Sequence, residues 1–131
     1  MLRTLATLVT VAGLSASGAA LADKDAADLA ALQVVMQRHI DSQLIDGALH
    51  HLDLETGNVV RYYPTEAHAM VMAIGDDYIL CTDLASTQGA SVPVDFYVTP
   101  TDDGYRVYQT EIDNREPLRA LIDKNQVERI R

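Results

Sequence analysis

The sequence predicts an α+β domain, in which a long helix near the N-terminus packs on an antiparallel sheet. Between residues 25 and 46, apolar residues recur every three or four positions, which is typical of a helix with one buried face. After Gly47 the period changes to two, and turn-forming residues recur at short intervals, which indicates strands joined by hairpins. We therefore expect a signal peptide at residues 1–22, followed by a single domain at residues 23–131.

The first 22 residues have the organisation of a secretory signal peptide. Arg3 precedes an apolar stretch at residues 5–14, and small residues follow up to Ala22. Cleavage after Ala22 would leave a chain that begins at Asp23, in the periplasm or outside the cell. It removes one arginine and no acidic residue, which leaves 9 basic against 19 acidic residues and changes the formal net charge from −9 to −10. Nucleic acid is therefore disfavoured as a partner, and so is a membrane after cleavage.

The long helix is predicted over residues 25–46. Its buried face carries five apolar side chains, Leu29, Leu32, Met36, Ile40 and Leu44. Gln33 lies on the opposite face, where we expect it to be exposed. Gly47 follows the last turn and is expected to end the helix in a left-handed conformation.

Three hairpins are predicted, with strands at residues 48–54 and 58–63, 69–74 and 78–84, and 92–99 and 105–112. Such short connections favour an antiparallel meander of about five or six strands. Within the first strand, His50 shares a face with Leu52 and Leu54 and is expected to be partly buried. In the second hairpin, Met72 is expected opposite Cys81, or one position away.

The clearest strand pattern is at residues 92–98, where Val92, Val94, Phe96 and Val98 alternate with other residues. We expect this row to face the helix near Met36, and Asp95 to be exposed on the other face. A short C-terminal helix should follow, with Pro117 in its first turn, a cap at Asp113 or Asn114, and an apolar face formed by Leu118, Leu121 and Ile122. The order of elements is similar to that of cystatin-like and NTF2-like architectures. This similarity covers element order only, so it identifies no functional residue.

One stretch contains residue types that bind soft metals: His68, Met70, Met72 and Cys81, the only cysteine. Methionine and free cysteine are also common core residues, and close ligand pairs of the C-x-x-C type are missing from the sequence. We therefore favour a packed hairpin and expect neither a metal nor another cofactor, and a copper carrier stays as an alternative.

An enzyme would need a polar cluster in a cavity between helix and sheet. Asp83, on the face of Cys81, is the best candidate for a catalytic carboxylate. Tyrosines combine a large apolar ring with a polar tip, which makes them candidates for ligand binding. Those considered are Tyr62, Tyr78, Tyr97 and Tyr108.

No sequence motif identifies a hydrolase or a nucleotide-binding protein. The expected function is a non-enzymatic, exported binding or accessory domain for a protein partner or a small apolar ligand. A small enzyme with a cavity between helix and sheet is the alternative from a different class. An open sheet also has two edges, so a homodimer is compatible with the sequence.

Overall fold

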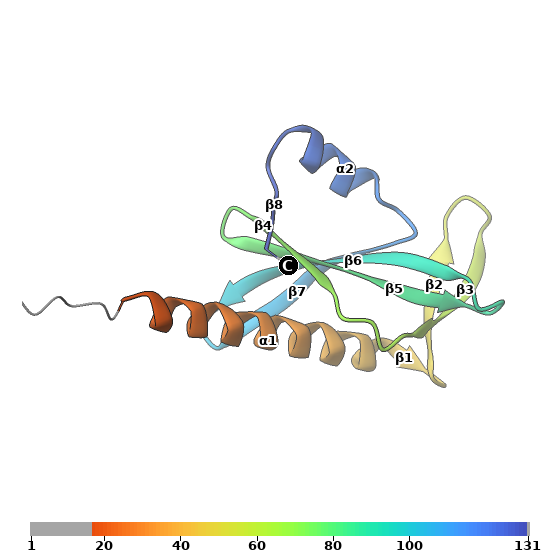
Figure 1. Ribbon diagram of the computed structural model, residues 1–131. Helices are drawn as coiled ribbons and strands as arrows, with labels where there is room; N and C mark the ends of the chain where they lie inside the picture. The colour runs from red at the N-terminus through yellow and green to blue at the C-terminus, as the bar shows by residue number, and fades with distance from the viewer. Residues whose placement is uncertain (1–16, 131) are drawn as a thin grey trace, which may run out of the picture.

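The fold was determined from a computed structural model, which describes the backbone of residues 17–130 and the side chains of residues 28–130. The predicted signal peptide therefore lies mainly outside the described residues. Two helices and eight strands form an α+β domain with an open antiparallel sheet (Figure 1). In chain order they are α1 (Ser17–Gln43), β1 (Leu44–Ile45), β2 (Ala48–Asp53), β3 (Asn58–Pro64), β4 (Met70–Ile74), β5 (Asp77–Ser86), β6 (Ser91–Thr101), β7 (Gly104–Ile112), α2 (Glu116–Asp123) and β8 (Glu128–Arg129). Within residues 17–130, no helix combines the length and apolarity needed to cross a membrane.

The long strand β5 is the centre of the sheet. One of its edges pairs with β6, and β6 pairs with β7. The other edge pairs with β4 near the start of β5 and with β3 near its end. Beyond these strands, β2 and β1 follow β3, and β8 follows β4. The three predicted hairpins are confirmed, but the short strands β1 and β8 were missed, so the strand number exceeds the prediction.

Helix α1 ends at Gln43, three residues before the predicted end, because Leu44 and Ile45 pair with β2. Gly47 has the expected positive φ, 81°, but it does not cap the helix. It forms the turn between β1 and β2 together with Asp46, whose φ is 51°. Positive φ at both central residues is the requirement of a type I′ hairpin turn.

The register of the β4–β5 hairpin differs from the prediction. Met72 lies opposite Ile79, and Cys81 lies opposite Met70. The shift of two positions arises because the loop contains only Gly75 and Asp76, so that Asp77 already pairs with β4. Gly75 has a φ of 56° at the first loop position, where a type II′ turn requires glycine.

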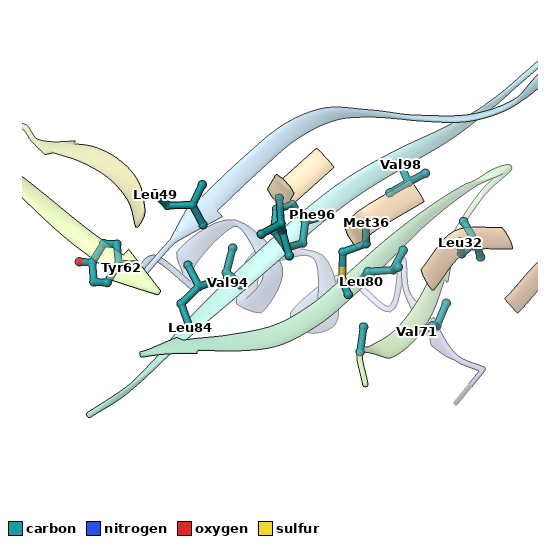
Figure 2. Packing of buried hydrophobic residues seen from close by; sticks show 12 residues of the cluster. Leu32, Met36, Leu49, Tyr62, Val71, Leu80, Leu84, Val94, Phe96 and Val98 are labelled. Atoms are coloured by element: carbon teal, nitrogen blue, oxygen red, sulfur yellow. The ribbon is translucent and has the colours of Figure 1, made fainter. Parts of the chain in front are cut away.

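The main core lies between α1 and one face of the sheet (Figure 2). Phe96, Val94 and Val98 are buried there beside Met36, which confirms the predicted packing of this strand on the helix. Val92 is partly buried at the margin of the same cluster. The apolar row at residues 92–98 thus holds β6 against α1.

Gln33 of α1 is not fully exposed, contrary to the prediction. Its side-chain amide donates a hydrogen bond to the carbonyl of Ala69 at 3.1 Å and accepts one from the amide of Ala69 at 3.3 Å. Ala69 lies in the segment that interrupts the pairing with β5 between β3 and β4. Gln33 therefore supplies the hydrogen bonds that a neighbouring strand would make at this point.

A second, smaller core lies on the opposite face of the sheet, beneath α2. It consists of Met72, Ile79, Cys81 and Tyr97 from the sheet and Leu118 from the helix. The sequence predicted only the long helix on the sheet and assigned no position to the short C-terminal helix. Leu118 and Leu121 of α2 pack against the sheet as predicted, but Ile122, which was predicted on the same face, is 46% exposed. Arg115 occupies the cap position, and Asn114 accepts a hydrogen bond from the amide of Glu116 at 3.3 Å.

Candidate functional site

The second core contains a buried polar cluster, formed by Cys81, Asp95, Tyr97 and Arg115. Asp95 is only 1% exposed, so the prediction that it is exposed is wrong. The strand does present Asp95 on the face opposite Phe96, but α2 and the residues preceding it cover that face. Asp95 lies beside Cys81 on β5 and Glu111 on β7, and one of its carboxylate oxygens is 3.5 Å from the guanidinium of Arg115.

The electrostatics of this cluster follow from its burial. Burial raises the pKa of Asp95, and the charge of Glu111 adds to this effect, whereas the Cys81 thiol and Arg115 oppose it. Neither carboxylate oxygen has a hydrogen-bond partner of good geometry among the described residues, and the hydroxyl of Tyr97 has none either. Burial, followed by the charge of Asp95, raises the pKa of Cys81 to about 12. The thiol is therefore protonated at neutral pH and is a poor nucleophile and a poor metal ligand.

The four residues considered as metal ligands lie in different environments. His68 is exposed in the segment before β4, whereas Met72 and Cys81 are packed in the second core, with Met70 at its margin. In the part of the chain with described side chains, no three His, Cys, Asp or Glu residues lie close enough together to hold a metal ion. The positions of Met72 and Cys81 match the packed hairpin favoured from the sequence.

Asp83 and the four tyrosines do not form one cluster either. Asp83 is exposed on β5. Tyr78 packs edge-on against Tyr105, with ring centroids 5.8 Å apart. Tyr97 is buried in the second core, while the neighbouring Tyr108 is 53% exposed and donates a hydrogen bond to Asp77 at 3.1 Å. The remaining tyrosine, Tyr62, lines a cavity.

This cavity is a groove between the β2–β3 hairpin and the end of β7, and we call it the β2–β7 groove. It is lined by residues 51–55, Tyr62 and residues 110–114, and it has a volume of about 460 Å³. Strand β7 lies at one end of the hydrogen-bonded series of strands, and β2 lies near the other end, next to the short strand β1. Because residues of both line one groove, the sheet is curved enough to bring its two ends close together.

Tyr62 is only 8% exposed, and no described residue forms a hydrogen bond with its hydroxyl. Figure 2 shows the ring at the end of the main core, with its oxygen pointing away from the other labelled side chains. Burial raises the pKa of Tyr62, and the charges of Asp113 and Asp53 add to this effect. The hydroxyl therefore lies in a negative field produced by both walls of the groove.

Two of the groove carboxylates are held by hydrogen bonds. Glu111 accepts bonds from the side-chain amides of Gln109 and Asn114, both at 2.9 Å. Asp53 accepts a bond from the backbone amide of Glu55 at 2.9 Å, and this bond lowers the pKa of Asp53. Groups that are already ordered lose less conformational entropy when a ligand binds to them.

A smaller pocket of about 160 Å³ adjoins the groove and reaches the main core. Its walls include Leu49, Val94, Phe96 and Ile112, and His39 of α1 lies beside them. The His39 ring packs edge-on against Phe96 at a centroid distance of 5.8 Å, and burial lowers its pKa. This volume lies below the roughly 300–1,000 Å³ of most small-molecule sites.

The rim of the groove is partly apolar, which the sequence analysis missed. Leu52 is 52% exposed and Leu54 is 87% exposed, whereas Leu49 and His51 point inward. His50 is exposed together with these leucines, so its predicted burial is wrong. The reason is that β2 extends past the edge of the core, and nothing in the described chain covers its outer face there.

Comparison of the chain with protein-family models, with curated proteins and with solved structures found no match.

Proposed function

We propose that the protein is a non-enzymatic, exported binding domain and that a protein partner occupies the β2–β7 groove. One observation carries the proposal: the groove combines ordered carboxylates, a buried tyrosine whose hydroxyl has no hydrogen-bond partner among the described residues, and exposed leucines at its rim. Exposed apolar side chains beside a concavity are typical of interaction sites. The order of elements, which resembles that of cystatin-like and NTF2-like domains, is compatible with this function but identifies none of these residues.

The polar lining of the groove and the small volume of its apolar extension favour a protein over a small apolar ligand as the occupant. Sites for small molecules are mostly apolar and enclose their ligand. The β2–β7 groove instead carries the carboxylates of Asp53, Glu55, Glu111 and Asp113, and its apolar extension of about 160 Å³ accommodates little more than a side chain. A protein segment can bind both to the carboxylate-lined groove and to its apolar extension, since it has a polar backbone and apolar side chains.

Site-specific photo-crosslinking in the producing cell tests this proposal. A photoreactive residue at Leu54 reports on the groove, and the same residue at the exposed Asp102, in the β6–β7 turn, is the control. We expect a discrete crosslinked protein from position 54 that position 102 does not give. Thr110→Trp, which fills the groove from an exposed position, should abolish this product.

Equal crosslinking from both positions, or a product that persists in Thr110→Trp, would contradict the assignment of the groove. A product that is unaffected by Thr110→Trp would show that the partner contacts the hairpin tip from outside.

A further inference from the structure

The β2–β7 groove is bordered by strand edges and not by sheet faces. Successive residues of a strand point to opposite faces, so a cavity on one face is lined by every second residue. Here consecutive strand residues line the same cavity, 51–53 of β2 and 110–112 of β7, together with the residues that follow each strand, 54–55 and 113–114. A cavity reaches both alternating sets of side chains only where it runs along the edge of the strand.

Both of these edges lack a strand partner in the described chain. Strand β7 pairs only with β6. The outer edge of β2 pairs with β1 only at Ala48 and Leu49, so from His50 onward this edge has no partner strand in the described chain. An unpaired edge presents backbone amides and carbonyls that a further extended segment can bind.

The negative charge of the groove indicates that the segment which binds there is positively charged. Four carboxylates line it, at Asp53, Glu55, Glu111 and Asp113, and its lining residues include no lysine or arginine. Tyr62, more than nine-tenths buried, lines this groove, its hydroxyl has no hydrogen-bond partner among the described residues, and the charges of Asp113 and Asp53 act on it. A hydroxyl and carboxylates together can accept the several hydrogen bonds that a guanidinium or an ammonium group donates.

We infer that the occupant is an extended, basic segment of a partner protein, which adds as a strand along the free edge of β7. Lysine or arginine side chains on one face of this segment pair with the groove carboxylates and with Tyr62. An apolar side chain between them enters the adjoining pocket beside Phe96 and Ile112. This inference rests on the proposed function and names the chemistry of the partner at the same groove.

Fluorescently labelled synthetic peptides test the inference. They are about ten residues long, which is the length of a long strand. The probe alternates lysine with leucine or valine. One control peptide replaces every lysine by glutamate, and another keeps the charge but carries proline at alternate positions, which prevents strand pairing. We expect binding of the probe alone, with an affinity that falls as salt concentration rises.

Two charge-neutralising variants provide a matched comparison. Asp53→Asn with Asp113→Asn removes two groove charges and preserves the local backbone, since asparagine also accepts the turn hydrogen bond and tolerates the φ of 53° at position 113. Asp102→Asn with Asp123→Asn removes two exposed charges elsewhere. We expect the first pair to weaken binding about tenfold, at roughly two- to fivefold per charge, and the second pair to change it less than about twofold.

Tyr62→Phe, which removes only the hydroxyl, should weaken binding of the lysine peptide about threefold or more. Equal binding of the glutamate peptide, equal binding of the proline peptide, or an equal effect of the two variant pairs would overturn the inference. If Leu54 forms a specific crosslink but no lysine peptide binds, the groove is the binding site and only the assigned occupant is wrong. If position 54 gives no specific crosslink and no lysine peptide binds, the proposed function is rejected as well.

Discussion

Replacement of Arg115 by methionine should destabilise the protein, because it leaves the buried carboxylate of Asp95 without its positively charged partner. Methionine keeps an unbranched apolar chain over the second core but removes the guanidinium 3.5 Å from the carboxylate. Breaking a fully buried ion pair costs about 3–5 kcal/mol. Because the Arg115 side chain is 31% exposed, solvent screens part of the interaction, and we expect a loss of about 1–3 kcal/mol in the free energy of unfolding at pH 7.

The loss should depend on pH, and its sign follows from the pKa of Asp95. Burial raises this pKa in the folded state, and Arg115 opposes the rise, so the variant raises it further. As the pH falls, the folded variant takes up a proton on Asp95 and no longer buries an unpaired charge. The difference in stability between the variant and the original protein should therefore be largest near pH 7 and should shrink as the pH approaches about 4.

Urea unfolding of a double-mutant cycle measures this coupling directly. In the Asp95→Asn background, Arg115→Met should cost clearly less, since no charge remains to be paired. Arg119→Met is the control, because Arg119 forms an exposed ion pair with Glu116 at 3.0 Å and should contribute less than about 0.5 kcal/mol. An equal cost in both Asp95 backgrounds, or a cost that is independent of pH, would refute the role of the ion pair.

Three further predictions concern other parts of the chain. Cys81, 4% exposed and with its pKa raised to about 12, should react with a thiol reagent only after denaturant is added; rapid labelling of the native protein would contradict its packing. Gln33→Ala removes both hydrogen bonds to Ala69 and should lower the free energy of unfolding by about 1–3 kcal/mol, whereas a change below about 0.5 kcal/mol would show that the segment is held otherwise. N-terminal sequencing of the protein from its producing cell should find Asp23 first, and retention of Met1 would remove the case for export.

The sequence predicted those elements whose residues show a strong period or a recognisable turn. The alternation of Val94, Phe96 and Val98 was sufficient to place one face of β6 against α1, because burial of one face imposes this pattern. The same alternation placed Asp95 on the opposite face, but it could not reveal that α2 covers this face, so the predicted exposure of Asp95 was wrong. Strand β8, only two residues long, carries no period at all.

The candidate site was predictable only in part. Tyr62 was considered from the sequence, but its relation to Asp113 depends on the curvature that brings β2 and β7 together. Such proximity between the two ends of a sheet depends on long-range geometry, and no local residue pattern encodes it. Leu52 and Leu54 were misassigned because apolar residues on a strand usually face a core, whereas here β2 extends beyond it.

Amide hydrogen exchange, measured by NMR with and without the lysine peptide, tests most directly whether the β2–β7 groove is the binding surface. Strand addition satisfies every second backbone amide along one edge. The predicted result is peptide-dependent protection of alternate amides between residues 109 and 113, with the amides of the β6–β7 turn unchanged. Protection confined to the α2 face of the sheet, or no change along β7 when the peptide is bound, would contradict the assignment of the groove.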